Sequence, residues 1–183
     1  MIFLVLNQPL IKSIFYNMEK VVLGLGSNLG HRLFNLKKAV KFLYSLPGFD
    51  FLAFSSVYET EPWGFKNQNN YLNCTVAGLY RSSARDLFAG IKEIEKKIGR
   101  KSRERWHPRE IDIDILFFGS KIIKGKNLAV PHPQIKYRNF VLVPLAEIMP
   151  GFVHPVIKKQ VKALLAVSGD KGKVILYERN LSR

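Results

Sequence analysis

The alternation of hydrophobic and polar positions predicts four strands and two helices between residues 20 and 118. Short apolar or alternating runs rich in β-branched and aromatic residues are typical of strands. Apolar residues that recur every three or four positions are typical of helices with one buried face. On these grounds we expect strands at 20–26, 51–60, 71–80 and 110–118, and helices at 33–43 and 84–98.

The two expected helices have recognisable ends. Pro47 and Gly48 stop the first helix. Ser82 or Ser83 can cap the N-terminus of the second helix, because their hydroxyl groups accept hydrogen bonds from unpaired backbone N–H groups. Gly99 suits the position just past its last turn, where a left-handed backbone is common.

The order of these elements is strand, helix, strand, strand, helix, strand, which predicts a ferredoxin-like α+β fold with a βαββαβ core. Beyond it, we expect an added C-terminal part with a hairpin and helices. Gly119 and Ser120 form a tight turn that leads into 121–123, and prolines interrupt the chain thereafter. A helix near 157–167 and a strand near 173–177 complete the expectation.

The first residues do not fit this pattern. The apolar run at 1–6 is broken by Asn7 and Pro9, so it is too short to span a membrane, and no small-residue cleavage site follows it. We interpret 1–19 as an extension and 20–183 as a single domain. A chain that begins at Met18 is expected to keep its fold and activity.

Charge narrows the class of ligand. The 183 residues include 29 Lys and Arg against 14 Asp and Glu, for a net charge of +15. Such a surplus attracts anions: nucleic acid, anionic lipid or a phosphorylated small molecule. Cys74 is the single cysteine, so no internal disulfide can form, which fits a reducing, cytoplasmic location. Cys74 itself is interpreted as a small core residue.

An acidic pair lies in the last expected strand of the core. Asp112 and Asp114 share one face of the strand because alternate side chains point the same way. Two carboxylates about 7 Å apart repel each other unless cations lie near them. Magnesium is a hard cation that takes a few carboxylates and fills its other positions with water and phosphate oxygens. The alternative is a solvated strand face.

A basic segment precedes this pair and changes its interpretation. Arginine suits bidentate contacts with phosphate, and Trp106 adds a flat surface for a ring. Carboxylates that can hold a metal beside several arginines are what phosphoryl transfer requires. The alternative is a solvated cationic loop. The basic residues are Arg100, Lys101, Arg103, Arg105 and Arg109.

The loop at 61–70 offers a second binding surface. Trp63, Phe65 and Tyr71 could clamp a flat heterocycle, and Asn73 could hydrogen-bond its edge; alternatively, these rings only pack the loop on the sheet.

Two other patterns carry less weight. The glycines of 24–30 imitate a dinucleotide-binding turn, but no acidic residue follows at the end of the second strand. His132 lies among prolines, where a structural role is common, and no zinc-ligand set is present.

Four segments, in this order, resemble the 6-hydroxymethyl-7,8-dihydropterin pyrophosphokinase family. They are GSNL at 26–29, YETEPWG at 58–64 with YLN at 71–73, GRKSRERWHPREIDIDIL at 99–116, and VPHP at 130–133 with Arg138 and Phe140. The resemblance covers about residues 20–150. It implies a ferredoxin-like enzyme of folate synthesis that moves the pyrophosphoryl group of ATP to the pterin hydroxymethyl group and releases AMP.

The resemblance also implies a role for each matching residue. Asp112 and Asp114 would ligate two Mg²⁺ ions and act in catalysis with Arg100 and Arg109. The residues implied to bind ATP are Arg100, Arg103, Arg105, Trp106, Ile115, His132 and Arg138. The residues implied to bind the pterin are Thr60, Pro62, Trp63, Tyr71, Asn73, Trp106, Asp112 and Phe140.

Two rival classes remain open from the sequence. A ferredoxin-like sheet with a net charge of +15 could bind nucleic acid by stacking bases on exposed aromatic rings, although the basic residues here lie beside carboxylates that repel phosphate. A ligand-binding module would bind pterin without releasing AMP. We expect the enzyme, as a cytoplasmic monomer with small-molecule substrates and no nucleic-acid or membrane partner.

Overall fold

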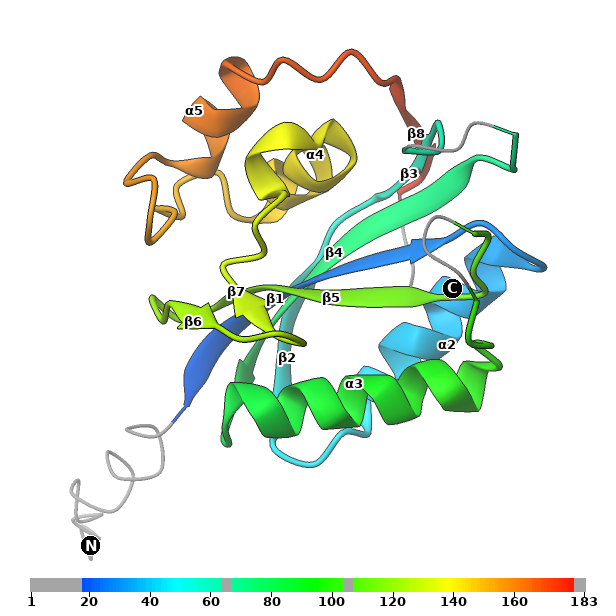
Figure 1. Ribbon diagram of the computed structural model, residues 1–183, viewed down its shortest axis with the longest axis horizontal. Coiled ribbons are helices and arrows are strands. Elements are labelled where there is room, and N and C mark those ends of the chain that lie inside the picture. Colours follow the sequence, from blue (N-terminus) through cyan, green and yellow to red (C-terminus); the bar gives the residue numbers. More distant parts are fainter. Residues whose placement is uncertain (1–17, 64–66, 104–106, 180–183) are drawn as a thin grey trace, which may run out of the picture.

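The computed structural model describes residues 18–63, 67–103 and 107–179, and a six-stranded antiparallel sheet lies at its centre (Figure 1). The strands follow the order β5-β1-β4-β3-β8. β2 and β3 share one edge of β4, each pairing with a different part of it. The sheet consists of β1 (Glu19–Ser27), β2 (Phe49–Phe54), β3 (Val57–Thr60), β4 (Tyr71–Tyr80), β5 (Asp112–Phe118) and β8 (Val174–Glu178).

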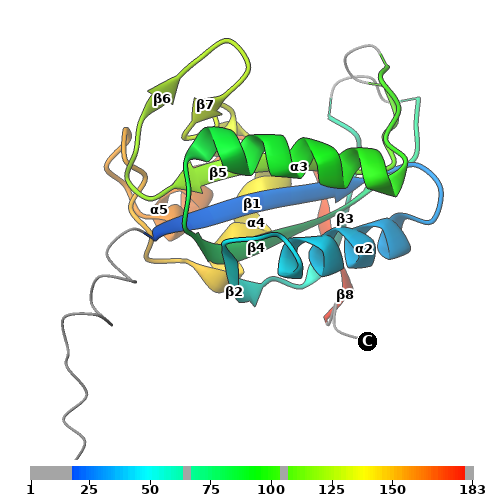
Figure 2. The same ribbon diagram turned by 90° about the horizontal axis from the view of Figure 1, so that it is seen from below.

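The chain path confirms the predicted fold class. Helix α2 (Arg32–Tyr44) follows β1, and α3 (Ala84–Ile98) follows β4. Both helices lie on the same face of the sheet (Figure 2). With β2 and β3 taken as one interrupted strand, the order from β1 to β5 is the βαββαβ order of a ferredoxin-like α+β domain.

The predicted ends of α3 are confirmed. The Ser83 hydroxyl accepts a hydrogen bond from Asp86 N, and the Asp86 carboxylate accepts one from Ser83 N, which together form a capping box. Gly99 ends the helix with a φ of 105°, a left-handed conformation that glycine adopts without steric cost. These ends determine where the basic segment begins.

The two faces of the sheet carry separate hydrophobic cores. Val21, Leu23 and Leu25 of β1 join α2 and α3 in the first core, while Val22 joins the second core on the opposite face. Helices α4 (Asn139–Ile148) and α5 (Val161–Ala166) cover that opposite face (Figure 1). Because side chains alternate along a strand, one apolar run supplies both cores. Cys74 is buried in the first core, as predicted.

Helix α4 was not predicted. It contains Pro144, which lacks the N–H that would continue the helical hydrogen bonds. The helix nevertheless forms, and Val141, Leu142 and Leu145 are buried against the sheet. Packing of this apolar face outweighs the local effect of the proline.

The prediction of one strand at 51–60 was wrong, because the strand is interrupted at Ser55 and Ser56. The Ser56 backbone N–H and hydroxyl both donate to the Glu147 carboxylate of α4, at 2.9 Å each. The Ser55 hydroxyl donates to Ser56 O at 2.8 Å and accepts from Thr75 N at 2.9 Å. These bonds replace part of the strand pairing and let β2 and β3 take different courses along β4.

Other boundaries shifted. β5 begins at Asp112 rather than at residue 110, and α5 is shorter than the expected 157–167. The turn at Gly119 forms, with Lys121 N donating to Phe118 O at 3.1 Å. The segment beyond it pairs differently from a simple hairpin with β5: β6 (Ile123–Lys124) pairs with β7 (Ala129–Val130). A short 3-10 turn, Ile135–Tyr137, precedes α4.

Among the described residues, no helix has the length and the apolar character needed to cross a membrane.

Candidate active site

A cavity of about 260 Å³ opens on the face of the sheet that carries α4. Alternation places side chains of three neighbouring strands on this face. Strand β4 contributes Asn73, Cys74 and Thr75, β5 contributes Asp112 and Asp114, and β1 contributes Gly24, Leu25 and Gly26. The lining also includes Thr60, Glu61, Trp63, Tyr71, Arg109, Leu116, His132, Arg138, Phe140 and Val141.

Two glycines of β1 make room for the cavity. Gly26 is the strand partner of both Asn73 and Asp112, and Gly24 is the partner of Asp114. A Cβ atom at Gly26 would lie 2.8 Å from Asn73 Oδ1, closer than real Cβ atoms approach other atoms. Close packing of the site therefore favours glycine at position 26, whereas a Cβ at Gly24 would lie at an ordinary 3.4 Å from Leu116.

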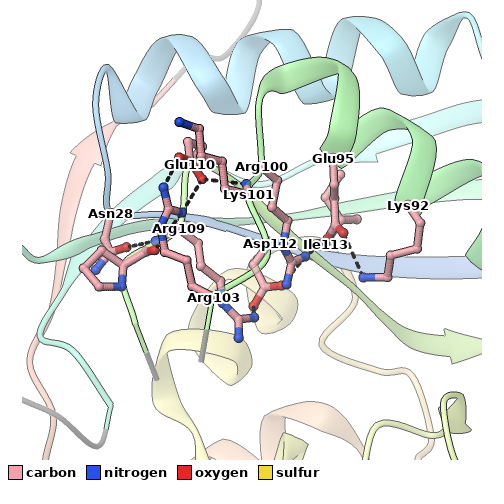
Figure 3. A network of polar contacts seen from close by, with 11 residues as sticks. Asn28, Lys92, Glu95, Arg100, Lys101, Arg103, Arg109, Glu110, Asp112 and Ile113 are labelled. Atoms are coloured by element: carbon pink, nitrogen blue, oxygen red, sulfur yellow. Dashed lines mark hydrogen bonds and ion pairs between the residues drawn. The ribbon is translucent and has the colours of Figure 1, made fainter. Parts of the chain in front are cut away.

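The acidic pair lies between arginines and the cavity. Asp112 accepts ion-paired contacts from Arg100 Nη1 at 2.8 Å and from Arg109 Nη1 at 3.0 Å (Figure 3). Asp114 keeps some solvent contact through the cavity and is otherwise surrounded by protein. Burial, followed by the charge of Asp112, raises the pKa of the Asp114 carboxyl to about 6, although Lys92 and Arg138 oppose the shift.

A buried carboxylate supports this pair from behind. Glu95 of α3 is 2% exposed, ion-pairs with Arg100, and accepts a hydrogen bond from Lys92 Nζ at 2.9 Å and from Ile113 N at 2.8 Å. It thereby joins α3 to β5 between the two aspartates (Figure 3). Sequence reasoning missed Glu95. The available signal was an acidic residue on the apolar stripe of a helix.

The basic segment is tied to the fold at two further points. Arg103 forms a two-pronged ion pair with Glu110, at 2.8 and 2.6 Å, and this contact lowers the pKa of Glu110 to about 2. Arg109 N donates to Asn28 Oδ1 at 2.7 Å, and Arg109 O accepts from the N–H groups of Asn28 and Leu29 at 3.1 Å each. The guanidinium groups of Arg100 and Arg109 are therefore held next to Asp112.

Asn28 also reaches the loop that precedes β4. Its Nδ2 donates to Gln68 Oε1 at 2.9 Å and to Asn69 O at 3.3 Å. One fully buried amide thus connects the β1–α2 turn, the basic segment and the loop beside the cavity. The sequence placed Asn28 within a matching segment but assigned it no role.

The predicted heterocycle-binding residues that the structure describes come together around the cavity, with one exception; Phe65 and Trp106 lie outside the described residues. Thr60, Trp63, Tyr71, Asn73 and Phe140 line the cavity, whereas Pro62 does not. Asn73 Nδ2 donates to Thr60 Oγ1 at 2.7 Å. The rings of Trp63 and Phe140 have centroids 6.3 Å apart, and the Arg138 guanidinium lies 5.9 and 5.5 Å from them. Flat faces and an amide edge suit a flat, polar heterocycle.

The predicted ATP-binding residues divide into four groups. Arg100 and Arg103 line a second, basic hollow with Lys92, Lys96 and Lys101, and Arg109 lines both hollows. His132 and Arg138 line the first cavity, where burial and the Arg138 charge lower the pKa of His132 to about 4. Ile115 faces the core beneath α2 and α3 and lines neither hollow. Arg105 and Trp106 lie outside the described residues.

The donor atoms fit magnesium better than zinc. Within the described residues, no group of three or more His, Cys, Asp and Glu side chains could enclose a metal. Magnesium is commonly bound by one or two carboxylates, with water and substrate phosphates as its other ligands. Asp112 and Asp114 supply that number, and burial, followed by the charge of Asp112, raises the pKa of Asp114, a shift that a bound cation would oppose.

Comparison with known proteins decides the family. A model of the family described as 7,8-dihydro-6-hydroxymethylpterin-pyrophosphokinase (HPPK) matches residues 22–150. The chain belongs to the HPPK family. A 2-amino-4-hydroxy-6-hydroxymethyldihydropteridine pyrophosphokinase of Aquifex aeolicus is 43% identical over 145 residues, covering 79% of this chain and 89% of the relative. A protein of the same name from Synechocystis is 40% identical, covering 73% and 68%.

Larger members of the family and solved structures agree with this assignment. The mitochondrial folate synthesis bifunctional protein of Pisum sativum is 40% identical over 72% of this chain, which spans 25% of that relative. A crystal structure of Plasmodium falciparum HPPK-DHPS with pterin and p-hydroxybenzoate has a TM-score of 0.66 at 17% identity. The match covers 81% of this chain and 43% of that one, and at this identity it confirms the fold alone.

Proposed function

We propose that this chain transfers the pyrophosphoryl group of ATP to the hydroxymethyl group of 6-hydroxymethyl-7,8-dihydropterin, as a step of folate synthesis. The observation that carries this proposal is the position of Asp112 and Asp114. They lie between an arginine-lined hollow and a cavity with aromatic rings and an amide. Family membership and the names of the relatives support the same reaction.

The pterin would occupy the larger cavity. Tyr71, Trp63 and Phe140 offer ring faces, and Asn73 offers an amide to the polar edge of the heterocycle. Such a site selects its ligand by a few polar groups in a mainly apolar wall. The hydroxymethyl group would then point toward Asp112, which the resemblance also places in the pterin pocket.

ATP would bind across the basic hollow, with its phosphates toward the acidic pair. In the structure, the guanidinium groups of Arg100 and Arg109 contact Asp112. The same groups would also donate hydrogen bonds to the phosphate oxygens of bound ATP. We assign Arg103, Arg105, His132 and Arg138 to the same task, and Trp106 to the nucleotide or pterin ring. Ile115 could act only by supporting β5 from the core side.

Asp112 and Asp114 are the residues that would hold two Mg²⁺ ions. Bound there, magnesium would neutralise phosphate oxygens and align the two substrates. The chain itself binds and orients: the aromatic cavity fixes the hydroxymethyl oxygen, and the arginines fix the triphosphate. The hydroxyl oxygen attacks the β-phosphorus and its proton passes to solvent. The bond from the β-phosphorus to the oxygen shared with the α-phosphate breaks, and AMP leaves with that oxygen, without a covalent intermediate on the protein.

The decisive assay measures AMP release with ATP, the pterin and magnesium, with and without a chelator. AMP should form only when all three are present, and the chelator should abolish it. Pterin binding without AMP release would identify a binding module instead. Tight RNA retention in a filter-binding titration, without AMP release, would favour the nucleic-acid class.

Removal of either carboxylate tests the acidic pair. Asp112→Ala and Asp114→Ala should each lower turnover by about a thousand-fold or more, because metal-mediated charge stabilisation is worth several kcal/mol and each 1.4 kcal/mol is ten-fold. Far-UV circular dichroism and melting temperature should stay close to those of the parent. Asp50→Ala, at an exposed ion pair with Arg81, is the control and should keep full activity. Near-normal turnover in both site variants would contradict the proposal.

We also propose that the protein acts as a cytoplasmic monomer with small-molecule substrates and without nucleic-acid or membrane partners. The arrangement of charge supports the absence of a nucleic-acid partner, because Arg100, Arg103 and Arg109 pair with carboxylates that repel phosphate. Light scattering coupled to size-exclusion chromatography measures the mass in solution, and a dimer mass would overturn the monomer assignment.

A further inference from the structure

A buried hydroxyl in the wall of the large cavity has no role in the assignments above. Thr75 of β4 is 1% exposed, lines the cavity, and its Oγ1 has no hydrogen-bond partner among the described residues. A buried hydroxyl left without a partner destabilises the fold, so such groups are rare. An unpaired hydroxyl in a cavity wall indicates a partner that enters the cavity.

The rest of Thr75 is fully engaged. Its N–H donates to Ser55 Oγ at 2.9 Å, and its carbonyl accepts from Ser55 N at 2.9 Å. On its other side it is the strand partner of Gly24, which has no side chain to fill the space. The backbone is thus held on both sides, and the hydroxyl is left without a hydrogen-bond partner in the wall of the cavity.

The position of Thr75 relative to the other polar groups indicates what it would bind. Tyr71, Asn73 and Thr75 alternate along one face of β4, so Thr75 lies one side-chain step beyond the amide already assigned to the heterocycle. Leu116 and Val141, which also line the cavity, are apolar, and Asp114 lies across Gly24 from Thr75. A hydroxyl in such a wall can both donate and accept, which suits the alternating N–H, amino and oxo groups of a pterin edge.

We infer that the Thr75 hydroxyl hydrogen-bonds the polar edge of the bound pterin and helps to select it. The inference rests on the proposed function, and it adds a substrate-binding residue at a position that the matching segments do not include. The unpaired hydroxyl is retained because it becomes paired when the heterocycle binds.

Paired variants separate binding from stability. Thr75→Val keeps the branched shape and removes the hydroxyl; it should weaken the Kd for the pterin by about ten-fold, the effect of losing one buried hydrogen bond. Its melting temperature should be equal to or above that of the parent, because an unpaired polar group is gone. Its Kd for a non-hydrolysable ATP analogue should be unchanged. Thr75→Ser, which keeps a hydroxyl, should bind the pterin within about three-fold of the parent.

Ser55→Ala is the matched control. Its hydroxyl lies next to Thr75 but is already paired and does not line the cavity. It should lower the melting temperature and leave the pterin Kd unchanged, the opposite of the Thr75→Val pattern. Pterin binding by Thr75→Val at the parent's Kd would overturn the inference, as would equal weakening by Ser55→Ala. Absence of pterin binding by the parent protein would instead contradict the proposed function.

Discussion

Glu95 shows how a nearly buried residue can control a site through the partners that it holds. Its carboxylate contacts Lys92, Arg100 and the backbone of β5 between the two aspartates. A buried carboxylate is tolerated only when it is paired and hydrogen-bonded. In return, it holds Arg100 at the edge of the acidic pair. Glu95 is therefore a positioning residue.

Replacement of Glu95 by glutamine tests this role. Glu95→Gln can still accept from Ile113 N, but it removes the charge that pairs Arg100 and Lys92. We expect the KM for ATP to rise about ten-fold with a smaller change in the KM for the pterin, and the free energy of unfolding to fall by roughly 2 kcal/mol. Steady-state kinetics and urea denaturation measure both quantities. Glu93→Gln, at an exposed position of the same helix, should change neither; an unchanged KM for ATP in Glu95→Gln would refute the positioning role.

The role of a residue could be predicted from the sequence where that role depends only on neighbouring positions in the chain. Asp112 and Asp114 could be assigned to one face because strand alternation needs no knowledge of the fold. Glu95 and Thr75 could not, because their roles depend on other elements: β5 for Glu95, and the cavity that several strands and α4 enclose for Thr75. Ile115 was assigned by resemblance alone, and the structure places it on the core side of β5.

At the scale of elements, Asn28 unites three segments that the chain order keeps apart. The β1–α2 turn, the basic segment and the loop before β4 all bond to this one amide. The arginines and the aromatic residues of the site therefore depend on a common support. A loss at Asn28 should disturb the binding of both substrates, unlike the loss at Glu95.

Asn28→Ala should raise the KM for ATP and for the pterin together and lower turnover by roughly ten- to hundred-fold, since small displacements of positioned groups are costly in catalysis. The melting temperature should also fall, because Arg109 N and the loop lose a buried partner. Asn28→Asp keeps the acceptor for Arg109 N and should recover part of the activity. Asn70→Ala, at an exposed side chain of the same loop, is the control. A selective effect on one substrate would show that the segments are held independently.

Helices and strands were predicted well where the apolar residues recur with a regular period. They were predicted poorly where a residue distant in the sequence determines the structure. The helices α2 and α3 and the strands β1 and β4 follow from periodicity and end signals. The interruption between β2 and β3 depends on Glu147, 91 residues away from Ser56. Helix α4 forms despite Pro144 because its apolar face is buried on a sheet that no local window of sequence describes.

In the molecule as a whole, one face of the sheet serves mainly stability, and the opposite face also carries the candidate site. One face packs against α2 and α3, and the other combines a second core with the cavity. Element order alone was sufficient to predict this fold class, because few topologies satisfy it. The pairing of β8 with β3 at the sheet edge was not predictable, since nothing local to 174–178 specifies its partner strand.

The segment before β1 lies outside the family match. The family match begins at residue 22, and the described members of both cores begin at Val21. We propose that 20–183 forms the single domain. A chain that starts at Met18 should melt within a few degrees of the full chain and release AMP at the same rate. Differential scanning fluorimetry and the AMP assay measure this, and a large fall in melting temperature would show that the first 17 residues are part of the fold.

The alternation of β5 has a consequence for folding fidelity. In the native register, Asp112 and Asp114 stand opposite Gly26 and Gly24, and Ile113 faces the core. A slip of one residue against β1 would turn both carboxylates into the apolar layer under α3 and expose the isoleucine. Each unpaired buried carboxylate costs several kcal/mol. The two aspartates that would bind metal therefore also destabilise a shifted pairing of β5 with β1. They favour the native register of the sheet before any substrate is bound.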